Sequence, residues 1–198
     1  LKEKPPYTAV FSAYDVRKSF YRSILAGAAG MTYGCEPIRQ LHRHNDRIHI
    51  FDYYDMPTWE EALSAPGSSQ LGMFAELLRE RDYFSRVPAQ ELFVPHRSHG
   101  AWPDHMATGL DFAGQQNTDP VSHISVARCR KGNYIMAYLP VRQVLTLDTS
   151  VLNGQAMKVL SFDPEECKLT SRYVATNTGS LTIVPERDLD TLVIVDSE

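Results

Sequence analysis

The feature that most constrains the fold of this 198-residue chain is a change of hydrophobic periodicity along its length. In the second half, short runs rich in β-branched and aromatic residues alternate with turn formers such as Asn153-Gly154 and Asp163-Pro164. Strands at this spacing are typical of a small antiparallel β-sandwich. We therefore expect seven strands, within residues 123–129, 133–139, 144–150, 156–162, 169–175, 180–184 and 191–197.

The first half has the periodicity of amphipathic helices instead. Val16, Phe20 and Ile24 recur at the spacing of one helix face, which predicts a helix over residues 15–26. Ser12 is suited to cap its N-terminus. Glycines suited to end it follow directly, at Gly27 and Gly30.

A second helical region spans residues 58–81, where apolar residues again recur at helical spacing. Pro66 divides this region, and it suits the first turn of the longer helix because a proline lacks only an N–H that has no partner there. Residues 31–34 and 47–53 are the strand candidates between the helices.

The two halves differ in how complete they are. Residues 1–90 hold too few elements for a self-contained α/β domain, although their amphipathic helices must bury a face. We therefore expect residues 1–90 to be the end of a larger α/β unit, and residues 91–198 to be a separate β-sandwich. The segment that joins them, residues 97–120, is long and polar, and loops of this kind are usually functional or poorly ordered.

Composition excludes several classes of function. With 43% hydrophobic residues, 22% charged residues and a net charge of −4, the chain has no basic stripe, so nucleic acid is not an expected partner. No apolar run approaches the ~18 residues that a membrane-spanning helix needs. The first residues lack the pattern of a signal peptide, and a start at Leu1 suggests processing or a piece of a longer polypeptide.

Metal and cofactor motifs are also missing from the sequence. The three cysteines are widely spaced, and the seven histidines show only HxH and HxxH spacings, which are weak without a cysteine pair or a helical HExxH motif. No nucleophile elbow, P-loop or dinucleotide-binding glycine motif occurs. We expect neither a metal nor a cofactor.

Several motifs in order resemble the tail end of one family. They are Asp15-Val16-Arg17, the alanine–glycine run 26–30, Thr32-Tyr33-Gly34, the helix start Ala65-Pro66-Gly67 and Phe162-Asp163-Pro164. In this order they resemble the apiosidase-like glycoside hydrolases, in which a barrel precedes a β-sandwich of the class named as a collagen-binding domain of a collagenase. The resemblance covers nearly the whole chain.

The resemblance implies a (β/α)8 barrel that hydrolyses glycosidic bonds in complex plant glycans. Only the last β/α units of such a barrel fit into residues 1–90, because a full barrel takes about 250 residues. In this family the two catalytic carboxylates lie on earlier strands, so the resemblance assigns no catalytic residue here and predicts that this chain alone is inactive. It also implies a glycan substrate, a missing N-terminal barrel segment as partner, and an extracytoplasmic location.

By the same resemblance, the residues after the last barrel strand reach the substrate. Tyr33 could stack on a sugar ring or hydrogen-bond to it, and Gly34 would let the backbone come close; Thr32 lies beside them. Glu36 is the carboxylate nearest to this rim, but an acid pair needs a second carboxylate about 5–10 Å away. The other local carboxylates are Asp15, Asp52 and Asp55.

Other candidates favour a structural role. We expect Asp15 to stabilise the start of its helix and Arg17 to pair with a neighbouring acid. The aromatic residues of the predicted strands could form a carbohydrate platform, but alternating aromatic residues on strands are more often core. These residues are Tyr134, Tyr138, Phe162 and Tyr173, and Trp102 in the joining segment is a further candidate for the platform.

Two functions therefore stand after the sequence. The preferred one is the C-terminal portion of a barrel glycoside hydrolase, with the sandwich covering the flank of the barrel and Phe84, Val87, Leu92 and Phe93 near the junction. The alternative is a non-enzymatic module that binds a glycan or a matrix protein and uses residues 1–90 as a helical adaptor.

Overall fold

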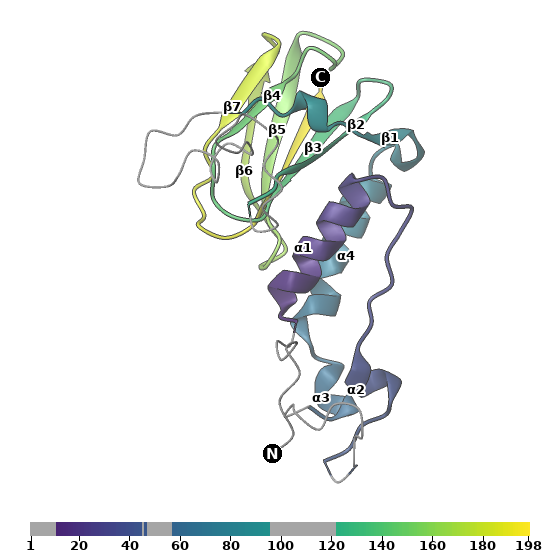
Figure 1. Cartoon of the computed structure of the whole chain (residues 1–198). Helices are drawn as coiled ribbons and strands as arrows, with labels where there is room; N and C mark the ends of the chain where they lie inside the picture. The colour runs from purple at the N-terminus through teal and green to yellow at the C-terminus, as the bar shows by residue number, and fades with distance from the viewer. Residues whose placement is uncertain (1–10, 45, 47–56, 96–121) are drawn as a thin grey trace, which may run out of the picture.

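The computed structural model describes residues 11–44, 46, 57–95 and 122–198. Two long helices lie side by side along one face of a six-stranded sheet, and a two-stranded sheet lies at its other face (Figure 1). All strand pairs are antiparallel. The chain therefore combines helices with antiparallel sheet, as expected at this coarse level.

The helix α1 begins and ends as the sequence predicts. It spans Ala13–Leu25, and the Ser12 side chain accepts a hydrogen bond from the Asp15 amide while the Asp15 carboxylate accepts one from the Ser12 amide. This reciprocal capping box satisfies two amides that the first turn leaves without helical partners. At the other end Gly27 adopts φ of 104°, a left-handed conformation that favours glycine and ends the helix.

The second helical region is divided as predicted. The short helix α3 spans Trp59–Ala62 and is capped by Thr58, and α4 spans Pro66–Arg79 with its proline in the first turn. A further short helix, α2, spans Glu36–Arg39. Two 3-10 turns follow α4, at Tyr83–Ser85 and Gln90–Leu92.

Each of the seven predicted strands is confirmed. They are β2 (Ser125–Cys129), β3 (Tyr134–Leu139), β4 (Leu145–Asp148), β5 (Ala156–Asp163), β6 (Lys168–Thr176), β7 (Ser180–Ile183) and β8 (Thr191–Ser197). A short strand that the sequence did not predict, β1 (Arg86–Pro88), pairs with β2. The larger sheet has the order β1-β2-β3-β8-β5-β6, and β4 pairs with β7 in the smaller one.

Alternation along the strands produces two separate cores, one on each face of the larger sheet. Ile135, Ala137, Val193 and Val195 face the smaller sheet, where Leu145, Leu147 and Leu181 complete a cluster. Their neighbours Met136, Tyr138, Leu192 and Ile194 face α1 and α4 instead. Because successive side chains of a strand point to opposite faces, a sheet covered on both sides is apolar along its full length.

The core under the helices is rich in aromatic rings. Tyr21 of α1 stacks between Phe74 of α4, at 4.2 Å between centroids, and Tyr138 of β3, at 4.7 Å. Tyr134 and Phe162 are buried in the same cluster. Three of the five aromatic residues considered for a carbohydrate platform are thus core residues, Tyr173 is 41% exposed, and Trp102 lies outside the described residues.

The prediction of a strand at residues 31–34 is wrong: the structure shows no strand there. A strand is defined by the neighbours to which it hydrogen-bonds, and no described strand pairs with this segment. The other strand candidate, residues 47–53, lies outside the described residues.

Of the four residues expected near the junction between the helices and the sheets, Val87 lies in β1, which pairs with β2, and Phe93 packs against the core between the two sheets. Phe84 is 94% exposed, and Leu92 packs in the core between the two sheets. The contact is made instead by the apolar faces of α1 and α4, through Phe20, Ile24, Leu77 and Leu78. Long amphipathic helices offer a wider apolar face than the short segment after α4.

Within the part of the chain that the structure describes, no helix is both long enough and apolar enough to span a membrane.

Candidate functional site

The predicted site residues lie on the segment that follows α1 and leads into α2. Thr32 and Gly34 are exposed, and no atom lies within 4 Å of the place that a side chain at position 34 would occupy. Thr32 and the Gly34 backbone are thus accessible from solvent. The structure brings Thr32, Tyr33, Gly34 and Glu36 onto one short segment and shows no ligand contact for them, so their roles stay predictions.

Tyr33 is half-buried and rests against the start of α4, beside α1. A Cβ atom at Gly67, at the start of α4, would lie 3.5 Å from the Tyr33 hydroxyl and 3.6 Å from Val16 Cβ on α1. Burial is the main cause that raises the Tyr33 pKa, and the nearby Cys35 adds to it. The hydroxyl therefore stays protonated at neutral pH and can donate a hydrogen bond.

Glu36 is engaged within its own short helix. Its carboxylate accepts hydrogen bonds from Arg39, at 2.6 Å, and from Gln40. The bond from Arg39 is the largest cause that lowers the pKa of Glu36. A carboxylate held ionised by a guanidinium is suited to accept hydrogen bonds and unsuited to donate a proton.

Asp15, another local carboxylate, is also engaged, in the capping box and with Lys18 at 3.4 Å. Its hydrogen bonds from Ser12 are the main cause that lowers its pKa. The remaining members of that set, Asp52 and Asp55, lie outside the described residues. Glu36 and Asp15 are thus both occupied by contacts within their own helices, which is the structural role expected for Asp15.

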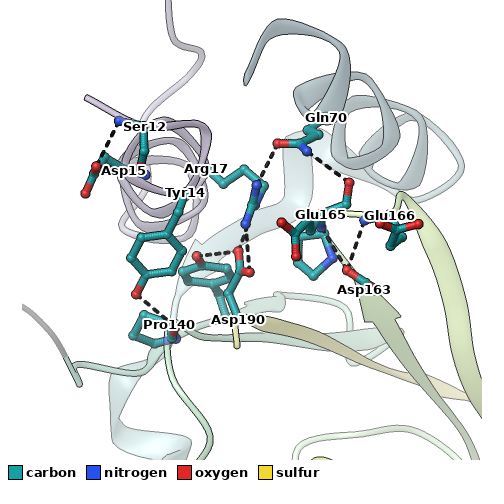
Figure 2. Close-up of polar contacts among 12 residues, drawn as sticks. Ser12, Tyr14, Asp15, Arg17, Gln70, Pro140, Asp163, Glu165, Glu166 and Asp190 are labelled. Carbon is teal, nitrogen blue, oxygen red and sulfur yellow. Dashed lines mark hydrogen bonds and ion pairs between the residues drawn. The ribbon is translucent and has the colours of Figure 1, made fainter. Parts of the chain in front are cut away.

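A buried polar network joins the helices to the sheets, and sequence reasoning found only one of its members (Figure 2). Arg17 Nε and Nη2 donate to the two carboxylate oxygens of Asp190, at 2.9 and 3.0 Å, and Nη1 donates to Gln70 Oε1 at 2.6 Å. Arg17 and Asp190 are only 2% and 0% exposed. The expectation that Arg17 pairs with an acid is confirmed, but the acid is distant in sequence.

Asp190 is satisfied from more than one side. The Tyr138 hydroxyl donates to Asp190 Oδ2 at 3.0 Å. Burial, followed by the negative charge of Asp190, raises the pKa of Tyr138 far above its usual range. A buried carboxylate needs this many donors, because taking a charge out of water is costly unless it is paired and hydrogen-bonded.

Gln70 extends the network to the turn between β5 and β6. Its Nε2 donates to the Glu165 carbonyl at 3.0 Å (Figure 2). The turn is closed by Asp163, fully buried, whose Oδ1 accepts from the amides of Glu165 and Glu166 at 2.9 and 3.0 Å and whose other oxygen pairs with Arg187. The Phe162-Asp163-Pro164 motif thus shapes a turn against which α4 is held.

A shallow pocket of about 320 Å³ lies at the C-terminal end of α1. Its lining is almost entirely apolar, with Arg79 as its one charged member among the described residues: Phe20, Ile24, Ala29, Gly30, Met31, Ala75, Leu78, Arg79 and Tyr83. A lining of this kind supplies surface for packing and no acid–base pair. It is separate from the predicted residues Tyr33 and Glu36.

No metal-binding cluster of three or more His, Cys, Asp or Glu side chains is present in the described part of the chain. His42 is buried, and His44 lies 3.9 Å from Glu61 at the surface. The remaining histidines other than His123 lie outside the described residues. The three cysteines are free thiols.

The comparisons with known families divide the chain in two. Residues 2–85 match the model described as "Apiosidase-like, catalytic domain", and residues 111–196 match the one described as "Putative collagen-binding domain of a collagenase". The boundary between the matches falls near β1, the strand that ties the first part to the larger sheet. A search of curated proteins returns no match.

Two solved structures are similar in fold. One is titled "Glycoside hydrolase"; it is 21% identical, with a TM-score of 0.75 over 96% of this chain. The other is a glycoside hydrolase family 5 protein from Bacteroides vulgatus ATCC 8482, 19% identical, with a TM-score of 0.76 over 98% of this chain. The chain spans 38% of the length of each.

The catalytic-domain match and the fold similarity both point to glycoside hydrolases as the class of proteins that this chain resembles. Within that class, the expected resemblance to the apiosidase-like family is confirmed, with the catalytic-domain match over the helical part and the collagen-binding-domain match over the strands.

Proposed function

We propose that these 198 residues act as the C-terminal portion of a glycoside hydrolase that cleaves complex, plant-type glycans. In this proposal residues 1–90 are the last β/α units of a (β/α)8 barrel, and residues 91–198 are an accessory β-sandwich. The observation that carries the proposal is the order of the two family matches within one chain, 2–85 and then 111–196, combined with the fold similarity to glycoside hydrolases.

The geometry supports a role in binding rather than in bond cleavage. Glycosidases use two carboxyl groups about 5–10 Å apart, one of which must be able to give up a proton. Glu36 is paired with Arg39, and Asp15 is held by Ser12 and Lys18. The catalytic carboxylates therefore belong, in this proposal, to a barrel segment outside these residues, and the present chain alone is inactive.

The test is a comparison of two polypeptides on a panel of plant glycans with detection of released reducing ends. One is the 198-residue chain, and the other is the same chain extended by the coding sequence that precedes Leu1. The proposal expects hydrolysis by the extended polypeptide and none by the short one. Hydrolysis by the short chain, or inactivity of the extended one on every glycan, would contradict it.

A second candidate function rests on the match of residues 111–196 to a domain named for collagen binding. The surface open to a macromolecule in such a module includes β6, nearly all of which is exposed, with Tyr173 and Val174 at 41% and 60%. The face of the larger sheet that lies under α1 and α4 is not open to a partner, because the helices cover it. Binding would therefore use the β6 side.

The discriminating experiment is a pull-down of the full 198-residue chain on insoluble polysaccharide and on collagen. A matched variant, Tyr173→Ala with Val174→Ala, tests whether any binding uses β6. The hydrolase proposal expects little retention on either matrix. Strong retention that this variant abolishes would favour the binding module instead.

A further inference from the structure

Tyr33 lies against α4 at the place where the N-terminal parts of α1 and α4 approach each other. Its ring lies against Gly67, where a Cβ atom would be 3.5 Å from the Tyr33 hydroxyl and 3.6 Å from the ring carbon Cε2. The same Cβ atom would lie 3.6 Å from Val16 Cβ on α1, so Gly67 fits closely between α1 and the Tyr33 ring. We call Gly67 and Val16 the Tyr33 seat. Any movement of one helix along the other changes the shape of this seat.

The two residues of the seat are adjacent to the buried polar network. Val16 precedes Arg17 on α1, and Gly67 lies three residues before Gln70 on α4. The hydrogen bond of 2.6 Å from Arg17 to Gln70 therefore fixes the two helices to each other directly beside the seat. Figure 2 shows Arg17 between Gln70 on one side and Asp190 on the other.

The network also fixes both helices to the sheets. Arg17 donates two hydrogen bonds to Asp190, at 2.9 and 3.0 Å, and Gln70 donates one to the Glu165 carbonyl at 3.0 Å. A two-pronged contact between a guanidinium and a carboxylate fixes direction as well as distance. Because Asp190 is buried and also bound by Tyr138, it cannot follow a rotating helix.

The segment from residue 27 to Tyr33 is also held at its other end, by contacts outside the buried polar network. Arg86 donates to the Ala28 carbonyl at 2.9 Å, and the Tyr83 hydroxyl donates to the Ala29 carbonyl. A Cβ atom at Gly27 would lie 3.1 Å from Pro88 of β1, so the end of α1 also touches the larger sheet. The segment from residue 27 to Tyr33 is thus anchored to sheet-linked residues at its start and rests on network-linked residues at its end.

We propose that Arg17 is a positioning residue for Tyr33. Through its bonds to Asp190 and Gln70, Arg17 holds the Tyr33 seat in a fixed position on the β-sheets, and the seat in turn orients the Tyr33 ring towards a bound glycan. The glycan in this statement rests on the proposed function. The dependence of the Tyr33 position on Arg17 does not rest on the proposed function, because it is a property of the 198-residue chain without any ligand. The sheets then serve the site as its scaffold.

The test places a single 3-fluorotyrosine at position 33 of the full chain and records its ¹⁹F resonance without ligand. Arg17→Met should shift or broaden that resonance. Arg17→Lys should return the resonance part of the way to its wild-type position, because it keeps a positive charge beside the Asp190 carboxylate. The matched control is Arg81→Met. It breaks a similar two-pronged contact between the helical part and the sheet, from Arg81 to Asp196 at 2.8 and 2.7 Å, away from the seat.

Each outcome decides the proposal. A resonance that moves in Arg17→Met and stays in place in Arg81→Met supports it. A resonance unmoved in Arg17→Met, or moved equally in both, overturns it. If Arg17→Met does not fold, Gln70→Met decides. It removes the Arg17–Gln70 bond beside the seat and the bond from Gln70 to the Glu165 carbonyl, leaves the Arg17–Asp190 pair in place, and must also move the resonance. Failure of the glycosidase assay would leave this result unaffected, so the two claims can fail separately.

Discussion

Arg17 of α1 and Asp190, which immediately precedes β8, form a two-pronged ion pair across 173 positions of sequence, and both side chains are buried. This pair borders the apolar contact between the helices and the larger sheet, because Asp190 also accepts a hydrogen bond from Tyr138 of that core. The parts of the chain that match two different family models are therefore one packed unit in this structure.

The first prediction concerns the stability that this pair controls. Arg17→Met leaves Asp190 charged and buried without its main partner, so we expect the free energy of unfolding to fall by about 3–5 kcal/mol. Denaturant unfolding followed by far-UV circular dichroism measures it. The control is Arg142→Met, which removes the exposed pair with Asp188 and should cost ~1 kcal/mol or less. Equal losses of unfolding free energy in the two variants would show that the buried pair contributes no more to stability than the exposed one.

The second prediction concerns the β-sheet part by itself. A chain of residues 91–198 lacks α1 and α4 and so exposes the apolar face that includes Met136, Tyr138, Leu192 and Ile194. Exposed apolar faces of this kind bind hydrophobic dyes and promote aggregation. We expect the truncated chain to bind the dye ANS and to associate in sedimentation experiments, whereas the full chain does neither. A monomeric truncated chain that binds no dye would contradict the shared core.

The third prediction concerns acid. The Ser12 hydrogen bonds lower the pKa of Asp15 below its ordinary value of 3.8 in the folded state. A lowered folded pKa stabilises the protein above the unfolded pKa, and this contribution is lost as the pH falls through the folded pKa. Ser12→Ala removes the hydrogen bond from the Ser12 hydroxyl, the largest cause of the lowered pKa, and keeps the one from the Ser12 backbone amide, so it should reduce the loss of stability below pH 3.8. Because Asp15 is largely exposed, the difference is small.

The matched comparison for this effect is the double variant with Asp15→Asn. Ser12 and Asp15 form one capping box, so the second substitution should add little to the first. Unfolding curves of the wild type and both variants, recorded at a series of pH values on either side of 3.8, measure the effect. Additive effects would mean that the two residues act separately.

The sequence predicted the local structure well because the signals for it are local. The alternation of apolar residues determines the strands, and Ser12, Gly27 and Pro66 mark helix ends through hydrogen bonds or backbone angles within a few residues. The segment 31–34 was predicted as a strand and is not one. Its extended conformation in a sheet would need a neighbouring strand, and local residues cannot reveal whether one is present.

Contacts between distant residues were harder to predict. Arg17 was expected to pair with an acid nearby, but its partner Asp190 stands among other polar residues after β7 and has no local sign of burial. Gln70 and Tyr138 likewise join the network only because the helices pack on β3. The residues of a buried network are chosen by tertiary packing, which a single sequence does not display.

The most direct test of the account is the kinetic effect of Tyr33→Ala in the extended polypeptide that begins upstream of Leu1. In the proposed function Tyr33 contacts the glycan and the reacting carboxylates lie elsewhere, so the variant should raise KM several-fold while kcat stays close to that of the wild type. Tyr33→Phe should show how much of the effect comes from the hydroxyl. An unchanged KM for Tyr33→Ala, or a complete loss of kcat, would contradict the account.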